Sequence, residues 1–180
     1  YDVILVGHSG HAEVEGTRGQ VDIDVKVVET VGDVANITVS DESKVAFVTQ
    51  TTLSVFDTGA IVAALRKRFP AIVGPDTRDI CYATQNRQMA VLELARIAEI
   101  VLVVGSPTSS NASRLVEIAA GAGVESHLVD GADKLDPNWV RGRSVIGITS
   151  GASTPESVVN DLVASIAALL PITVDELPGK

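Results

Sequence analysis

The sequence predicts an α/β fold made of two similar domains, and three observations support this prediction. The 180 residues are 46% hydrophobic but only 3% aromatic, which indicates cores built from Val, Ile, Leu and Ala. Short β-branched runs alternate with segments of helical periodicity, a pattern typical of parallel sheets covered by helices. The alternation occurs twice, and the two halves of the sequence can be aligned with each other.

The β-branched runs are expected to form six strands, at residues 3–6, 25–29, 45–49, 100–104, 127–129 and 145–149. Helices are expected where apolar side chains recur at helical spacing, at residues 57–69, 86–98 and 111–122. Pro155 is expected to open a last helix with Thr154 as its cap. The glycines after the first strand favour a loop there.

The two halves align as an internal repeat: VILVGHSGHAEVEGT matches VLVVGSPTSSNASRL, and KVAFVTQTTLSVFDT matches SVIGITSGASTPESV. Gly7 lies 42 positions before Thr49, and Gly105 lies 44 positions before Thr149, so equivalent strand ends recur almost in register. We therefore predict an α/β domain at residues 1–77, a second at residues 78–165 and a C-terminal tail at residues 166–180.

Charge and composition argue against several functional classes. Fourteen basic against 23 acidic residues give a net charge of −9, which disfavours binding to nucleic acid or to an anionic membrane surface. No apolar run reaches the roughly 18 residues of a membrane span. No secretory signal is visible and the chain has one cysteine, so we expect a cytoplasmic protein. Because the chain begins with Tyr1 inside a strand pattern, we expect upstream residues to have been trimmed or left out.

Polar side chains follow the first and third strands of each half, where open α/β sheets bind ligands. They are His11, Glu13, Thr51 and Thr52 in the first half, and Ser109, Ser110, Asn111 and Ser153 in the second. If the two sheets face each other, we predict that these residues converge on one crevice. A structure with the two clusters on opposite surfaces would contradict this prediction.

The Ser109, Ser110 and Asn111 cluster suits a phosphate or a carboxylate, because hydroxyls, an amide and helix N-terminal N–H groups all donate hydrogen bonds. The same residues also suit ordinary helix capping, and Ser153 presents the same two alternatives. Neither ATP nor nicotinamide binding is predicted, because the sequence lacks a P-loop and a dinucleotide glycine fingerprint.

The segment GHSGHAEVEGT places histidines, which can bind anions, beside carboxylates, which can carry protons. His8 and His11 are three positions apart, but no third ligand is evident, so zinc is not expected. Glu15 is expected to be solvated, and His127 to be structural. Cys81 is the only cysteine, so it is either a small core residue or one ligand of a site completed from elsewhere.

The motifs GHSGHAEVEGT, TQTTLS, DICYATQNRQ, GSPTSSNASRL and TSGASTPE, in this order and at these spacings, closely resemble those of the 4-hydroxy-3-methylbut-2-enyl diphosphate reductase family. These enzymes catalyse the last step of the methylerythritol phosphate route in isoprenoid biosynthesis. The resemblance implies an oxygen-sensitive iron–sulfur oxidoreductase with three α/β lobes in a trefoil around a [4Fe-4S] cluster. Two electrons and a proton remove the substrate hydroxyl as water, and a second proton goes to carbon, which gives isopentenyl and dimethylallyl diphosphate. Ferredoxin or flavodoxin donates the electrons.

The resemblance also implies roles for individual residues. Glu13 and Thr51 would be catalytic, with Glu13 as the proton source. Substrate binding would involve His11, Thr51, Ser109, Ser110, Asn111 and Ser153. Cys81 would be one of three thiolate ligands of the cluster, which makes this residue the metal ligand of the chain.

The main departure from the family is the absence of its first lobe, which carries two cluster cysteines and two further substrate-binding histidines. One thiolate cannot hold a four-iron cluster, so we expect the chain alone to be inactive and cluster-free. Smaller departures are Phe56, Pro107 and Thr108. The alternative function is a non-catalytic anion-binding module, whereas no motif favours a structural subunit. Cysteines in an upstream lobe would support the function as an enzyme. A start codon just before Tyr1 would support the function as a binding module.

Overall fold

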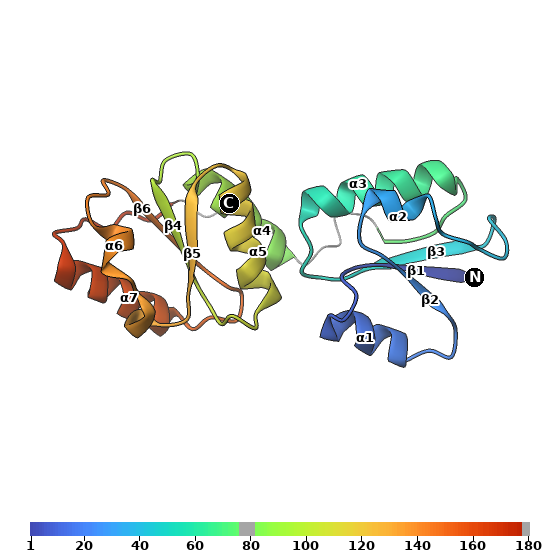
Figure 1. Cartoon of the computed structure of the whole chain (residues 1–180), viewed down its shortest axis with the longest axis horizontal. Coiled ribbons are helices and arrows are strands. Elements are labelled where there is room, and N and C mark those ends of the chain that lie inside the picture. Colours follow the sequence, from blue (N-terminus) through green and yellow to red (C-terminus); the bar gives the residue numbers. More distant parts are fainter. Residues whose placement is uncertain (76–81, 178–180) are drawn as a thin grey trace. The chain divides into compact units, whose positions relative to one another are not determined.

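The computed structural model describes residues 1–75 and 82–177. The chain divides into two compact units, Tyr1–Cys81 and Tyr82–Lys180, which are described separately. Figure 1 shows that each unit contains a small sheet with helices against it. Among the described residues, no helix combines the length and apolar character needed to cross a bilayer.

The first unit contains a three-stranded parallel sheet in the order β2-β1-β3. Its elements are β1 (Asp2–Val6), α1 (Ala12–Gly19), β2 (Val25–Val28), α2 (Val31–Val34), β3 (Val45–Thr49) and α3 (Val55–Arg68). Alternate residues of β1 face opposite sides: Ile4 and Val6 pack in the core beneath α3, whereas Leu5 packs against Val14 of α1. Helices therefore cover both faces of the sheet, with α2 and α3 on one side and α1 on the other (Figure 1).

The second unit contains a parallel sheet in the order β5-β4-β6. Its elements are α4 (Tyr82–Leu94), β4 (Ile100–Val104), α5 (Ser110–Gly121), β5 (Glu125–Val129), the 3₁₀ helix η2 (Ala132–Lys134), α6 (Pro137–Val140), β6 (Ile146–Ser150) and α7 (Glu156–Leu169). Strand β4 is buried along its whole length. Val101 and Val103 pack with Leu115 of α5 on one face, and Leu102 packs with Leu162 of α7 on the other.

The two units share one topology, in which the first strand lies between the second and the third and all pairings are parallel. This confirms the predicted α/β fold with parallel sheets and the internal repeat. All six predicted strands are present, with ends that differ by up to two residues. The predicted domain limits at residues 77 and 165 stay predictions.

The predicted loop after the first strand is confirmed at residues 7–11 but was wrong for residues 12–19, which form α1. The side chain of His11 caps this helix, and Val14 is buried against Leu5. Gly16 and Gly19 lie where an added Cβ would meet nothing within 4 Å, so they cost the helix only their conformational entropy. Capping and the burial of Val14 outweigh the low helix propensity of glycine.

Thr154 does not cap the last helix, contrary to prediction. Its hydroxyl donates to the carbonyl oxygen of Val104 at 3.0 Å, and α7 begins at Glu156 after Pro155. Two other helices begin earlier than expected. Helix α3 begins at Val55, two residues before the predicted start, with Ser54 as its cap, and α4 begins at Tyr82, four residues before the predicted start. A serine or threonine near a helix start is therefore a good but not sufficient sign of a cap.

Asp2 anchors the amino end of β1, far along the strand from the polar loops. Its Oδ1 accepts from Lys26 Nζ at 3.0 Å, and its Oδ2 accepts from the backbone N–H of Ser40 at 2.8 Å. The hydrogen bond from Lys26, and then that from Ser40, hold the pKa of Asp2 below its ordinary value. This end of the strand therefore has its own polar anchor.

Replacing Gly74 with Ala is expected to destabilise the first unit. Residue Val73 pairs with the edge of β3, and an added Cβ at Gly74 would lie 2.2 Å from Cε1 of Phe47, whose side chain is 1% exposed. Overpacking of this kind lowers the free energy of unfolding by about 1–3 kcal/mol, which denaturant unfolding would measure. Gly59→Ala in α3 is the matched control, because its added Cβ has no neighbour within 4 Å. Equal midpoints for the two variants would contradict the prediction.

Candidate functional site

In the first unit, the candidate site lies at the carboxyl ends of β1 and β3. His11 is the N-cap of α1, and its Nδ1 accepts from the backbone N–H of Glu13 at 3.2 Å. In a neutral ring this contact leaves the proton on Nε2. His11 therefore orders the first turn of the helix that carries Glu13.

The Glu13 carboxylate contacts Thr51 through both of its oxygens. Oε1 accepts from the backbone N–H of Thr51 at 2.8 Å, and Oε2 accepts from the Thr51 hydroxyl at 3.1 Å. The two residues are 38 positions apart in sequence. They meet because the carboxyl ends of the parallel strands β1 and β3 lie at the same edge of the sheet. A carboxylate that accepts two hydrogen bonds is fixed in orientation, which is what a positioned proton donor or acceptor needs.

Gln50, directly before Thr51, is a buried polar residue that the sequence reasoning did not single out. Its side chain is 2% exposed, its Oε1 accepts from the backbone N–H of His8 at 3.0 Å, and its Nε2 donates to Thr52 Oγ1 at 2.9 Å. The sequence feature that could have indicated Gln50 is its place in the motif TQTTLS, directly after a predicted strand.

Glu29, at the end of β2, is a second residue that the sequence reasoning did not single out. Its Oε1 accepts from the backbone N–H of Ser9 at 3.1 Å, and its Oε2 lies 3.4 Å from Nδ1 of His8. Hydrogen bonds from Ser9, and then the contact with His8, hold the pKa of Glu29 below its ordinary value. The loop after β1 is therefore tied to the ends of both β2 and β3.

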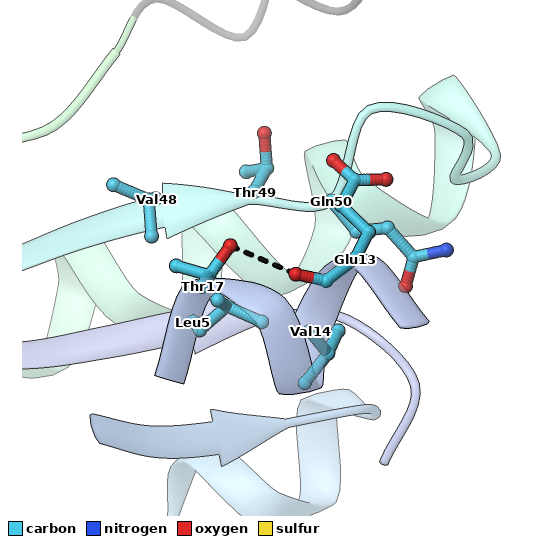
Figure 2. Close-up of a pocket in the computed structure, with 7 residues that line it drawn as sticks. All are labelled: Leu5, Glu13, Val14, Thr17, Val48, Thr49 and Gln50. Carbon is cyan, nitrogen blue, oxygen red and sulfur yellow. Dashed lines mark hydrogen bonds between the residues drawn. The ribbon is translucent and has the colours of Figure 1, made fainter. Parts of the chain in front are cut away.

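An open hollow of about 260 Å³ lies between α1 and β3. Its lining residues are Leu5, Glu13, Val14, Thr17, Val48, Thr49 and Gln50. Figure 2 shows the side chains of Glu13 and Gln50 at the same end of the hollow, with Leu5, Val14 and Val48 around the rest. The Thr17 hydroxyl donates to the backbone carbonyl of Glu13 at 2.8 Å. The Glu13 side chain is thus partly exposed at the mouth of a mostly apolar recess.

In the second unit, the predicted polar cluster lies at the start of α5. Ser109 is the N-cap, and its Oγ accepts from the backbone N–H of Ala112 at 3.3 Å, so the capping alternative is confirmed for this residue. Ser110 is the first residue of the helix, and Asn111 is the second. Ser153 is exposed in the loop between β6 and α7. A capping oxygen can still donate its own proton to a ligand.

Asn111 has the most unusual environment of the cluster. Its side chain is 7% exposed, and within residues 1–75 and 82–177 neither its Oδ1 nor its Nδ2 has a hydrogen-bond partner. A buried amide without partners costs about 1–3 kcal/mol, so such groups are rare, and a water molecule or a bound ligand is one way to satisfy them.

The repeat places Asn111 at the position that Glu13 occupies in the first unit. Both are the second residue of the helix after the first strand. The preceding turns also match: an added Cβ at Gly7 would lie 2.7 Å from Val14, and one at Gly105 would lie 2.7 Å from Ala112. Each glycine therefore permits its helix to pack closely on the strand end.

Glu13 and Asn111 differ in the hydrogen-bond donors that follow the third strand of their units. The backbone N–H of Gln50 donates to the Val6 carbonyl, and that of Gly151 donates to the Val104 carbonyl, so Gln50 and Gly151 are equivalent. The sequence alignment, which places Gln50 against Ser150, was therefore wrong by one residue at the third strand. The residue after Gly151 is Ala152, which has no hydroxyl, whereas the residue after Gln50 is Thr51. Glu13 consequently has partners where Asn111 has none among the described residues.

Other predicted features lie elsewhere. Cys81 lies outside the described residues. Within the part of the chain that is described, no three His, Cys, Asp or Glu side chains are grouped as metal ligands would be. His127 stacks on Trp139, with ring centroids 4.1 Å apart, and its Nε2 lies 2.9 Å from Glu125. Because the two units are described separately, the convergence of their polar clusters on one crevice stays a prediction.

Comparisons with known proteins identify the family. The LytB protein family model matches residues 1–167. The chain is 51% identical over 178 residues to 4-hydroxy-3-methylbut-2-enyl diphosphate reductase 1 of Rhodopseudomonas palustris, covering 99% of this chain and 58% of that protein. It is 49% identical to the reductase of the same name from Zymomonas mobilis, covering 98% of this chain and 52% of the relative.

Among solved structures, the fold is similar to that of the E-1-hydroxy-2-methyl-but-2-enyl-4-diphosphate reductase from Plasmodium falciparum. The TM-score is 0.84 at 38% identity, with 91% of this chain and 52% of that chain covered. The chain thus spans little more than half the length of these relatives. On the match to residues 1–167 and these identities, the chain belongs to the LytB protein family.

Proposed function

We propose that this chain is part of an oxidoreductase that reductively dehydroxylates 4-hydroxy-3-methylbut-2-enyl diphosphate to isopentenyl and dimethylallyl diphosphate. The observation that carries the proposal is the Glu13 carboxylate, held by the N–H and the hydroxyl of Thr51. The names of the relatives supply the reaction class and the substrate. The chain covers 58% or less of those relatives, so the proposed activity belongs to the longer protein.

Diphosphate binding is proposed for the donors at the helix starts. The chain has a net charge of −9, so its overall field repels an anion and recognition rests on local groups. The buried Asn111 amide supplies a donor without a partner among the described residues, and α5 adds its N-terminal dipole. Ser109, Ser110, Ser153, Thr51 and His11 complete the proposed set of binding residues.

Proton delivery is proposed for Glu13. Replacing a C–OH group by C–H consumes two electrons and two protons, one leaving with the hydroxyl as water and the other going to a carbon of the allyl group. The hydrogen bonds from Thr51 to both carboxyl oxygens, beside the recess that Glu13 lines, support Glu13 as the donor of the first proton. The Thr51 hydroxyl can also accept a proton from Glu13 and donate one onward.

A [4Fe-4S] cluster, when bound, would pass on the two electrons of this chemistry one at a time. Cys81 is the proposed ligand from this chain, since its thiolate is the kind of donor that iron–sulfur clusters use. A single thiolate is too few to hold the cluster, so the other ligands must come from outside these residues. The electron donor is proposed to be ferredoxin or flavodoxin, in the cytoplasm.

The test compares this chain with a protein of the relatives' full length that includes it, the longer protein. After anaerobic iron–sulfur reconstitution, the longer protein should show visible cluster absorption and convert the diphosphate substrate to the two products. This chain alone should show neither. If the longer protein bound pyrophosphate but neither held iron nor turned over, the non-catalytic anion-binding module would replace the proposal. Full reductase activity from this chain alone would contradict the ligand count.

A further inference from the structure

We propose that Gln50 is a positioning residue for the Glu13–Thr51 pair. Its amide ties the loop after β1 to the loop after β3, which are the two loops that lead to Glu13 and contain Thr51. The role of the pair itself rests on the proposed function above. The tie, however, is a geometric property of this chain and can be measured without any turnover.

Gln50 bonds to the chain on both sides of Gly7, at the end of β1 and in the loop after it. Its backbone N–H donates to the Val6 carbonyl at 2.8 Å, which is the last ladder bond between β1 and β3. Its side chain then turns back, and Oε1 accepts from the backbone N–H of His8 at 3.0 Å. One residue thus holds the end of β1 at two successive points, before and after Gly7.

Gln50 also constrains the turn that contains Thr51. Nε2 of Gln50 donates to Oγ1 of Thr52 at 2.9 Å, so the residues before and after Thr51 are joined to each other. Thr51 lies in the short turn that this bond closes, with its N–H directed at Glu13 Oε1. The turn therefore fixes the direction of the N–H group that orients the carboxylate.

Burial protects the hydrogen bonds of Gln50 from water. The Gln50 side chain is 2% exposed and both of its polar ends have partners, so water cannot readily replace either bond. The lack of a side chain at Gly7 leaves room for this amide, because an added Cβ there would lie 3.1 Å from Gln50 Oε1. A satisfied buried amide of this kind holds its neighbours in one arrangement.

The second unit provides an internal comparison. The residue equivalent to Gln50 is Gly151, which keeps the backbone bond to Val104 but has no side chain to make the tie. In that unit the hydroxyl of Thr154 reaches the Val104 carbonyl instead. Asn111, which is equivalent to Glu13, has no partner among the described residues. The side-chain tie and the paired carboxylate therefore occur together in one unit, and both are missing from the equivalent positions of the other.

The test is amide hydrogen exchange, measured by NMR on this chain. Gln50→Met has similar length but neither hydrogen bond, and we expect the amides of His8 and Thr51 to exchange about tenfold faster. Thr52→Val removes only the Nε2 partner, and we expect a smaller increase at Thr51. Asp2→Asn is the matched control, because it loses polar contacts at the other end of β1 and should leave Thr51 exchange unchanged.

In the longer protein, Gln50→Met should lower kcat by up to about 10²-fold with little change in KM, the loss expected when a catalytic group is misplaced by about 1 Å. Asp2→Asn should leave kcat unchanged. Wild-type exchange at Thr51 in both Gln50→Met and Thr52→Val would overturn the inference. Faster exchange at Thr51 in a longer protein with no reductase activity would support the tie and contradict the proposed function instead.

Discussion

Replacing Glu13 with Gln in the longer protein is expected to lower the rate of the chemical step by about 10²–10⁴-fold, the usual contribution of a positioned acid. Gln keeps the size of the side chain, and its oxygen can still accept from the Thr51 N–H, so the turn should be preserved. The variant lacks the carboxylic acid proton that Glu13 is proposed to donate. Substrate affinity should therefore stay within a few-fold of the wild type, whereas single-turnover rates should fall.

Glu15→Gln is the matched control for this experiment. Glu15 lies two residues further along α1, is exposed and contacts Arg18 at 3.5 Å, so it shares the helix but not the recess. We expect its variant to turn over normally. If Glu13→Gln kept the wild-type single-turnover rate, or if it raised KM alone, Glu13 would not be the proton source.

Replacing Asn111 with Ala is expected to weaken substrate binding without lowering the stability of the fold. Most substitutions of buried residues destabilise a protein, but this one removes two buried polar atoms that have no partner in the described part of the chain. Relief of that desolvation offsets the small cavity that the amide leaves. The free energy of unfolding of this chain, measured in denaturant, should therefore change by less than about 1 kcal/mol, or rise.

In the longer protein, the same variant should bind the diphosphate substrate about 10- to 100-fold more weakly, the loss of one hydrogen bond to a charged group. Ser126→Ala is the matched control, because Ser126 donates to the Val116 carbonyl at 2.9 Å in the same unit. It should lose about 1 kcal/mol of stability and keep its affinity. The reverse pattern, with Asn111→Ala unstable but binding normally, would show that the amide is structural.

The fold was predictable because strand formation depends largely on local sequence, here on short β-branched runs bounded by turn residues. Strands such as β3 and β4 have the predicted limits, and the repeat predicted the shared strand order. Helix α1 was missed because Gly16 and Gly19 are poor helix formers, while the burial of Val14 that stabilises the helix depends on the folded sheet. Local preference fails where a tertiary contact outweighs it.

The candidate site was predictable to a similar degree. Glu13 and Thr51 were expected near each other, since the carboxyl ends of neighbouring parallel strands meet at one edge. The bonds of Gln50 and the unpaired amide of Asn111 could not be read from the sequence, because they depend on where side chains point after packing. How the two domains face each other depends on surfaces that strand patterns do not describe.

The matched positions of Glu13 and Asn111 have an evolutionary consequence. Two copies of one strand–turn–helix segment hold a carboxylate in one unit and an amide in the other, on backbones fixed by Gly7 and Gly105. After duplication, such a segment would need a change of side chain at its second helical residue and a matching change after the third strand, where Thr51 contacts Glu13 and Ala152 has no hydroxyl, to exchange the proposed proton transfer for the proposed anion binding. Division of labour between the copies would then require no new backbone.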